Sequence, residues 1–300
     1  EFLQYMVTSD VNTLSQWEAS YSLLCYADGT TVDDIFIYNL PEYFYVVVNA
    51  ANLKKDVKWL QAHTPGFDVT VTDVSTETYM LALQGPRAQT ILQKIVDVDL
   101  VPVGFHFSTR GKVAGVDAII GNTGYTGEWG YELFFDANQA VKVWNAIMEA
   151  GAPEGIKPIG LAARDSLRFE PCLPLYGHEL SDSITPMEAG LGFAVKTDKG
   201  DFIGRDALLK QRLEGPPRKL VGIEMIDKGV PREHYEVMIE GEHGHVTSGM
   251  FAPTAEAYVA MALIPAHLAE LGQELDVIIR DKPKKAKIVK RPFYIPAYRR

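Results

Sequence analysis

The sequence contains little cysteine and no apolar run long enough to cross a membrane. Its two cysteines, Cys25 and Cys172, are far apart and match no metal-binding or redox spacing, which indicates a reducing compartment with both thiols buried or idle. The first residues, EFLQYMVTSD, lack the charged and apolar regions of a signal peptide. Together these absences predict a cytoplasmic protein that does not associate with membranes.

Several common signatures of chemistry are also missing. We find no serine nucleophile elbow, no Walker loop, no CxxC pair and no HExxH motif, which disfavours covalent, nucleotide-hydrolysing and metal-centred reactions. His243 and His245 have metal-like spacing but lie in a polar turn with no third ligand nearby, so we predict no metal site. The net charge of −10 argues against a general nucleic-acid binder, even though an acidic total can contain a local basic patch.

What remains is an ordinary globular composition. Of the 300 residues, 47% are hydrophobic and 23% are charged, which allows a sizeable core and predicts two or three domains. Residues 214–217 (EGPP) are the clearest domain boundary. Before it, strands and helices mix with tight strand–strand turns, which favours an α+β fold over a doubly wound parallel sheet. After it, six short strands predict a small barrel or a jelly-roll-like module.

Hydrophobic periodicity, caps and turn residues set the expected elements. Before the boundary we expect strands at 19–26, 69–74, 78–83, 112–121 and 130–135, and helices at the start of the chain, after Asn52, after Gly85-Pro86 and at 136–150, 159–169 and 202–213. After the boundary we expect strands at 219–225, 235–239, 245–251, 257–264, 274–279 and 286–293.

Residues 31–49 (TVDDIFIYNLPEYFYVVVN) are expected to form a hairpin that carries two adjacent carboxylates. Alternation places Asp33 and Asp34 on opposite faces, and both faces are otherwise apolar. A carboxylate in such surroundings must be paired, hydrogen-bonded or shifted in pKa, and groups of this kind cluster at functional sites. A turn centred near Pro41 would set Asp33 opposite Asn49. Periodicity alone does not choose between the two aspartates.

Residues 121–132 (GNTGYTGEWGYE) carry four glycines at intervals of three. A strand rather than a helix is expected to follow, so this is not a dinucleotide-binding loop. The glycines fit either a strained structural hairpin or a close backbone approach to a flat ligand. Glu132 lies in an otherwise apolar strand, where it is either a hydrogen-bond partner of the core or a ligand contact.

Two basic features also allow two interpretations. Arg164 and Arg168 fall on one helical face, either bonded to local carboxylates or forming a fork for a carboxylate or ring acceptor. Residues 280–291 (RDKPKKAKIVKR) form either a solvated strand face or a docking surface for an acidic partner.

An ordered set of motifs that spans nearly the whole chain resembles one family. The motifs are YSLLCYADGTTVDDIFIY, VVNAANLKKD, ALQGPRAQ, GYTGEWGYE, GLAARDSLRFE, LYGHEL, DFIGRDAL and VTSGMFAPT. In this order they are similar to the aminomethyltransferases, the T-proteins of the glycine cleavage system. The resemblance implies an α+β fold with three lobes around a central folate site. We place the ferredoxin-like lobe at about 1–104, the Greek-key lobe at about 105–213 and a C-terminal barrel or jelly-roll-like lobe at 218–300, with residues 1–213 forming the catalytic region.

The resemblance also implies the site residues. The family's catalytic aspartate matches Asp33, which leaves Asp34 as a structural partner. Its folate-binding residues match Tyr21, Asn49, Glu132, Arg164, Tyr176 and Tyr298. In the implied reaction a lipoylated H-protein presents an aminomethyl group, ammonia leaves, and tetrahydrofolate receives the one-carbon unit to give 5,10-methylenetetrahydrofolate. No metal, nucleic acid or membrane takes part, and in a eukaryote the compartment would be the mitochondrial matrix.

Two other folate-binding activities occur in the same superfamily. Demethylases act on methylated amines, sulfonium compounds or methoxy-aromatics and share much of the folate site. Non-catalytic iron–sulfur assembly factors carry a KGCYxGQE-type motif, which this chain lacks. Two departures from the family pattern are expected to matter: Gly29-Thr30 replaces paired glycines, and family members have a segment ahead of the position of Phe2 that helps to wall the folate site.

Overall fold

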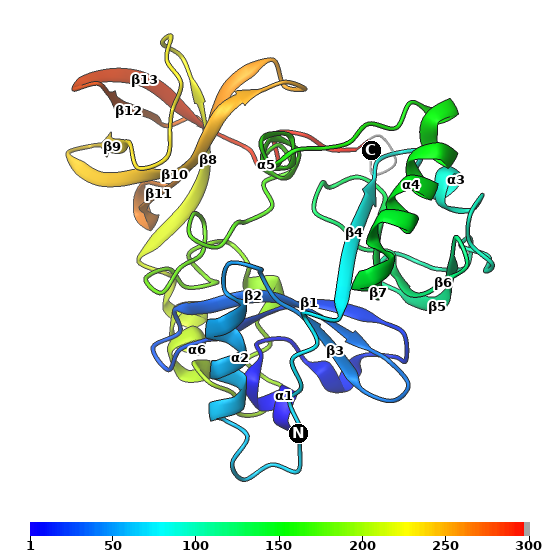
Figure 1. Ribbon diagram of the computed structural model, residues 1–300. Helices are drawn as coiled ribbons and strands as arrows, with labels where there is room; N and C mark the ends of the chain where they lie inside the picture. Colours follow the sequence, from blue (N-terminus) through cyan, green and yellow to red (C-terminus); the bar gives the residue numbers. More distant parts are fainter. Residues whose placement is uncertain (297–300) are drawn as a thin grey trace.

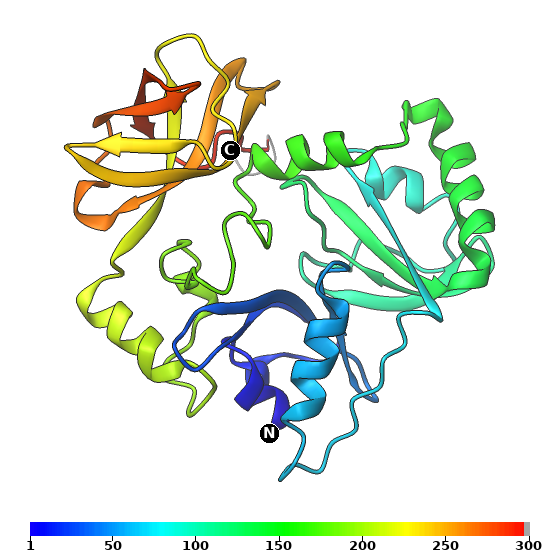
Figure 2. The same cartoon turned by 60° about the vertical axis from the view of Figure 1, so that its left-hand side comes forward.

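The computed structural model describes residues 1–296, which form three parts arranged around a centre (Figures 1 and 2). The fold combines helices with antiparallel sheets, as the α+β prediction requires. Within the described residues, no helix is long and apolar enough to span a membrane. Short 3₁₀ turns cover Val11–Thr13, Ala137–Gln139, Ala152–Glu154, Gly192–Ala194 and Ala266–Leu268.

The first part is a three-stranded antiparallel sheet in the order β1-β2-β3, with a helix after its last strand. Its bounds are α1 Phe2–Met6, β1 Ala19–Cys25, β2 Thr31–Asn39, β3 Phe44–Val47 and α2 Leu53–Ala62. The helix predicted at the start of the chain is confirmed, and its residues Phe2 and Met6 are buried in one cluster with Ile35 and Leu60. The strand expected at 69–74 does not form, because this segment joins no ladder.

The second part is a four-stranded antiparallel sheet in the order β4-β7-β6-β5. Its bounds are β4 Thr78–Gln84, α3 Ala88–Leu92, β5 Ser108–Val113, β6 Val116–Gly121, β7 Gly130–Asp136 and α4 Ala140–Gly151. The single strand expected at 112–121 is instead the end of β5 and all of β6. The chain reverses at Ala114 and Gly115, whose φ angles of 51° and 77° place both residues in the left-handed region.

The sheets do not divide the chain near residue 104, where the sequence places the boundary between two lobes. β4 comes before that position, yet it pairs with β7 along its whole length, from Thr78 opposite Asp136 to Gln84 opposite Gly130. Since pairing between distant strands decides which residues share a sheet, a local change in pattern does not reveal this division.

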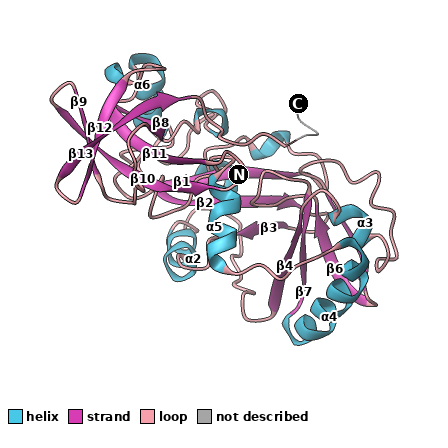
Figure 3. Ribbon diagram, turned by 90° about the horizontal axis from the view of Figure 1, so that it is seen from above, coloured by secondary structure: helices cyan, strands magenta, loops and turns pink. Residues whose placement is uncertain are grey.

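The third part is a closed six-stranded barrel in the order β10-β11-β8-β13-β12-β9, which confirms the predicted barrel. A largely irregular segment with two helices leads to it (Figure 3). The bounds are α5 Leu161–Phe169, α6 Arg205–Glu214, β8 Arg218–Met225, β9 Glu236–Ile239, β10 Glu242–Ala252, β11 Ala257–Pro265, β12 Glu274–Ile279 and β13 Lys282–Val289.

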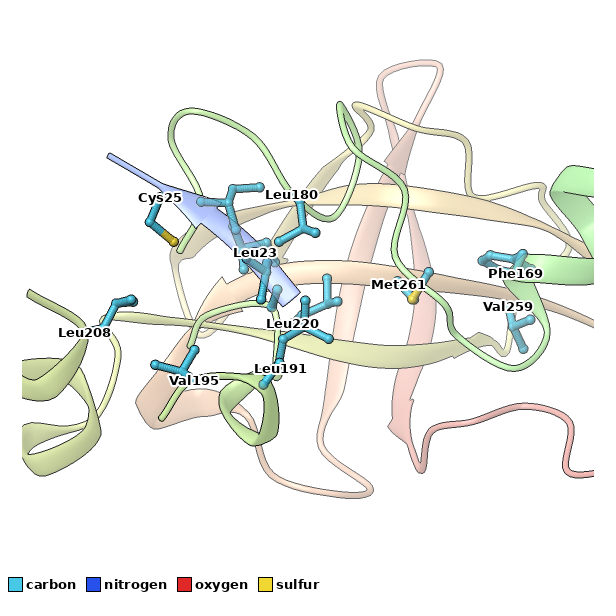
Figure 4. Close-up of a cluster of buried hydrophobic side chains, with 14 of the residues drawn as sticks. Leu23, Cys25, Phe169, Leu180, Leu191, Val195, Leu208, Leu220, Val259 and Met261 are labelled. Atoms are coloured by element: carbon cyan, nitrogen blue, oxygen red, sulfur yellow. The ribbon is translucent and has the colours of Figure 1, made fainter. Parts of the chain in front are cut away.

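One apolar cluster ties the barrel to the first sheet and to the segment between them (Figure 4). It contains Leu23 from β1, Leu180 and Leu191 from the irregular segment, and Leu220 and Met261 from the barrel. All five side chains are buried, and burying a leucine contributes about 2 kcal/mol. The cluster therefore holds β1 and the adjacent β2 in a fixed place relative to the barrel.

Candidate functional site

The hairpin of β2 and β3 holds the two adjacent carboxylates, but its register differs from the prediction. The ladder pairs Phe36 with Val47 and Tyr38 with Tyr45, one residue away from the expected alignment, and β3 ends before Asn49. Asn49 nevertheless reaches Asp33, because the backbone and the side chain of Asn49 both turn toward the carboxylate. The predicted neighbours therefore meet through hydrogen bonds rather than as a cross-strand pair.

Asp33 is fully buried and accepts three N–H bonds. Asn49 N donates to Oδ2 at 3.1 Å, and Asn49 Nδ2 donates to Oδ1 at 3.0 Å. Asn52 Nδ2, at the start of α2, donates to Oδ1 at 2.7 Å. Three donors compensate the desolvation of an ionised carboxylate and fix the direction of its oxygens.

Asp34 points to the other face of β2, as alternation predicts. Tyr21 OH donates to Asp34 Oδ2 at 3.1 Å, and Asn49 Nδ2 donates to Oδ1 at 2.8 Å. Burial, followed by the negative charge of Asp33, raises the pKa of Asp34 to about 6. Burial, then the charge of Asp34, raises the pKa of Tyr21 well above its usual range, so the tyrosine stays a donor. Asn49 therefore links both aspartates and orders the pair.

Tyr176 lies beside the start of the same strand. Its hydroxyl donates to the carbonyl of Thr31 at 3.3 Å, and Lys55 Nζ lies 3.9 Å from the centre of its ring. Lys55 also donates to the carbonyl of Val32. Burial raises the pKa of Tyr176 to about 12, and the charge of Asp33 adds to that shift. Tyr176 thus belongs to the surroundings of Asp33, and its predicted contact with folate stays a prediction.

Glu132 lies on β7, opposite Ala82 of β4. Thr123 Oγ1 donates to Glu132 Oε2 at 2.6 Å, and Tyr38 OH donates to the same oxygen at 3.3 Å. Burial raises the pKa of Glu132, while the two hydroxyl donors oppose that shift. Within the described residues neither bond uses the other oxygen, Oε1, so the carboxylate keeps capacity for a further donor.

The glycines of residues 121–132 make room for side chains of the protein itself. A Cβ atom on Gly121 would lie 2.7 Å from the Tyr38 ring, and one on Gly130 would lie 2.4 Å from the Gln84 side chain. Gln84 Nε2 in turn donates to the carbonyl of Thr123 at 3.1 Å. This close packing holds Thr123 against Glu132 and supports the structural interpretation of the glycines.

The two arginines of α5 have different environments. Arg164 is exposed and its guanidinium lies 4.5 Å from the centre of the Tyr125 ring. Arg168 is fully buried: its Nη1 donates to Glu179 at 2.8 Å, its Nε to Asp165 at 2.8 Å and its Nη2 to Ser248 of the barrel at 2.9 Å. Of the two interpretations left open, Arg168 fits bonding to carboxylates of the protein, so the two arginines do not form a shared fork. Arg168 joins α5 to the barrel, and Arg164 alone is available to a ligand.

Tyr125 connects the two groups of predicted site residues. Burial raises its pKa, and the charges that act on it include Asp34 from β2 and Arg164 from α5. Arg164 also acts on Glu132, lowering the pKa of that carboxyl. β2, β7 and α5 thus bring Asp34, Arg164 and Glu132 into one electrostatic neighbourhood. Tyr298 lies outside the described residues.

Five residues of this neighbourhood are absent from the prediction: Tyr38, Asn52, Asp56, Thr123 and Tyr125. Asn52 and Asp56 have a signal in the sequence, because they are four residues apart at the start of a helix and so share one face. Asp56 is fully buried, although aspartate is among the residues least often found so. Tyr38, Thr123 and Tyr125 carry no such signal, since their partners are distant in sequence.

One cavity lies away from these residues. It has a volume of about 1260 Å³ and lies between α1, β3, α2 and residues 67–78, with Tyr45, Phe67 and Phe134 in its wall. None of the candidate site residues lines it. The basic strand β13 carries local ion pairs, from Lys285 to Asp276 and from Lys287 to Glu224, which supports its interpretation as a solvated face.

Comparison with known proteins gives one consistent result. Residues 1–199 match the family model described as "GCVT N-terminal domain", and residues 218–294 match "Glycine cleavage T-protein C-terminal barrel domain". The aminomethyltransferase of Geobacillus kaustophilus is 53% identical over 98% of this chain and 81% of its own length, and that of Alkaliphilus metalliredigens is 46% identical over 100% and 82%. The crystal structure of the glycine cleavage system aminomethyltransferase T from Bartonella henselae superposes with a TM-score of 0.90, at 30% identity, over 98% of this chain and 80% of that one.

Proposed function

The chain belongs to the glycine cleavage T-protein family, and on that premise we propose that it binds tetrahydrofolate between Glu132 and Asp33 and transfers to it a one-carbon unit delivered by lipoylated H-protein. Its activity as an aminomethyltransferase follows from relatives that match it over nearly its whole length.

The observation that carries the proposal is the set of donors around Asp33. An aminomethyl group that loses ammonia leaves a cationic carbon stabilised by the lipoyl sulfur, and the folate amine that attacks it must release a proton. An oriented carboxylate can hold the amine, stabilise the cation and accept that proton. Asp33 has the required features, because Asn49 and Asn52 fix both of its oxygens.

Glu132 supplies the complementary contact for the pteridine ring. The amino and ring N–H groups of a pterin are donors, and a half-buried carboxylate with a free oxygen is a suitable acceptor. Arg164, Tyr21, Asn49 and Tyr176 would complete the wall of the site. Tyr298 is proposed as a further contact on the resemblance alone.

In the overall transfer, the carbon–nitrogen bond to ammonia and the carbon–sulfur bond to the lipoyl arm break. Two carbon–nitrogen bonds to the folate form, and the arm leaves as dihydrolipoyl thiol. No oxidant is needed, because the carbon keeps its oxidation level. The names and coverage of the relatives support this reaction rather than demethylation of a free donor.

An Asp33→Asn variant tests the assignment of Asp33. We expect it to bind tetrahydrofolate with a Kd close to that of the wild type, but to lose at least about 100-fold in the rate of methylenetetrahydrofolate formation, which is the range for removal of a general base. Asp117→Asn makes the same change at a side chain that is 91% exposed and should keep the full rate. Full activity of Asp33→Asn would overturn the assignment.

A further inference from the structure

A second fully buried carboxyl, Asp56, belongs to the surroundings of Asp33. Asp56 lies in the first turn of α2, four residues after Asn52, so both side chains project from the same face of the helix. The side-chain amide of Asn52 donates a hydrogen bond to Asp33 from that face. Within the described residues, no N–H or O–H group of another residue donates to either oxygen of Asp56, and the Asp56 side chain is in hydrogen-bonding contact with the Asp33 carboxyl.

The distribution of donors decides which of the two carboxyls carries a proton. Two buried carboxylates that interact cannot both be ionised at low cost. Asp33 accepts three N–H bonds, which stabilise its ionised form. Asp56 accepts none in the described part of the chain, so no hydrogen bond there compensates the desolvation of a charge on it. The proton therefore belongs on Asp56.

We propose that Asp56 is a positioning residue that remains a neutral carboxylic acid and offers its O–H to the Asp33 carboxylate from the α2 side. Asp33 is then oriented by Asn49, which follows β3, and by two side chains of α2, the amide of Asn52 and the acid of Asp56. The inference rests on the proposed role of Asp33 for its effect on the reaction, but the charge state of Asp56 does not depend on that role.

The other charged groups near Asp56 agree with this assignment. Burial, followed by the interaction with Asp33, raises the pKa of Asp56 well above its usual range. The negative charge of Asp34 adds to the increase, and Lys55 opposes it. Lys55 is held by the carbonyl of Val32, so it does not pair with Asp56. The titratable groups that face Asp56 are Asp33 and Asp34 from β2, Lys55 from α2, Tyr26 after β1 and Tyr176 from the irregular segment.

Carbon-13 labelling of the aspartate side chains, followed by NMR across a pH range, tests the charge state directly. We expect one aspartate carboxyl of the wild type to remain protonated above about pH 7, where ordinary aspartates are ionised. That resonance should be missing from Asp56→Asn and present in Asp206→Asn, a matched change at a helical side chain that is 93% exposed. If Asp56→Asn does not fold, the wild-type resonance alone supports the proposal. A wild type in which every aspartate is ionised by pH 7 overturns it.

Steady-state kinetics separates positioning from a purely structural role. Asp56→Asn keeps an N–H donor toward Asp33 and should retain most of kcat, whereas Asp56→Leu has no donor and should lose about 10- to 100-fold in kcat with little change in the KM for tetrahydrofolate. The wild type should lose kcat at alkaline pH, where Asp56 ionises, and Asp56→Asn should not. Equal kcat values for the leucine variant and the wild type overturn the positioning role. If Asp33→Asn is fully active while the high-pH aspartate resonance persists, the proposed role of Asp33 fails and the charge state of Asp56 stands.

Discussion

Asp33 and Asp34 are adjacent in the sequence, but their surroundings give them different chemistry. Asp33 is surrounded by amide donors, and Asp34 meets a tyrosine hydroxyl and one amide. Alternation placed them correctly on opposite faces of β2, but only the family resemblance selected Asp33, because periodicity contains no information about distant donors. Asn52 and Asp56 complete the surroundings of Asp33. Their spacing of four residues indicates that they share one helical face, but it does not indicate that this face meets Asp33.

Replacing Asp34 by asparagine is expected to change how stability depends on pH. The folded-state pKa of Asp34 is about 6, above the ordinary value of 3.8, so the folded chain holds a proton that the unfolded chain has lost between these values. The free energy of unfolding of the wild type should therefore fall as pH rises from about 4 to 6, by on the order of 3 kcal/mol relative to Asp34→Asn. Urea unfolding at several pH values measures this difference, and parallel curves would contradict it.

Replacing Glu132 by alanine is expected to weaken folate binding. The change removes the proposed acceptor for the pterin and leaves the hydroxyls of Thr123 and Tyr38 without their carboxylate acceptor. An unpaired buried group costs about 1–3 kcal/mol, so the Kd for tetrahydrofolate should rise about 5- to 150-fold by titration calorimetry. Glu149→Ala, at an exposed position of α4, serves as the control and should leave the Kd unchanged. An unchanged Kd in Glu132→Ala would remove Glu132 from the site.

At the scale of elements, the sequence was informative wherever local pattern decides the outcome. The apolar stripe of α4 and the six strands of the barrel follow from periodicity and turn residues. Three features depended on distant partners and were missed or misplaced: the register of β2 with β3, the absence of a strand at 69–74, and the pairing of β4 with β7. The same is true of α5. Helical spacing places Arg164 and Arg168 on one face as equivalent residues, whereas tertiary contacts bury Arg168 and leave Arg164 exposed.

The buried pair of Arg168 and Glu179 should hold α5 in place. Both side chains are fully buried, so removal of Glu179 leaves the Arg168 charge buried with only the partly exposed Asp165 as its counter-charge. We expect Glu179→Ala to lower the free energy of unfolding by about 3–5 kcal/mol. Glu154→Ala breaks ion pairs whose Arg87 and Lys94 side chains are 65% and 39% exposed, and should cost less than about 1 kcal/mol. Similar losses in the two variants would show that the buried pair does not anchor the helix.

At the scale of the whole molecule, the candidate site is built from segments far apart in the chain. β2 provides the aspartates, β7 provides Glu132 and α5 provides Arg164, while the barrel fixes α5 through Ser248. A ligand that contacts all three segments should stabilise their arrangement. At about 100 times its Kd, tetrahydrofolate is expected to add about 2.7 kcal/mol to the stability of the folded chain and to raise its melting temperature. The same folate concentration should shift Glu132→Ala less, and a wild type whose melting temperature does not move would argue against a folate site.

The most direct test of the central claim is ammonia release from an aminomethylated lipoyl carrier, measured with and without tetrahydrofolate. We predict rapid ammonia release only when the carrier and tetrahydrofolate are both present, with methylenetetrahydrofolate formed in equal amount. Activity on a free methylated amine, sulfonium compound or methoxy-aromatic, together with none on the carrier, would contradict the account and indicate a demethylase.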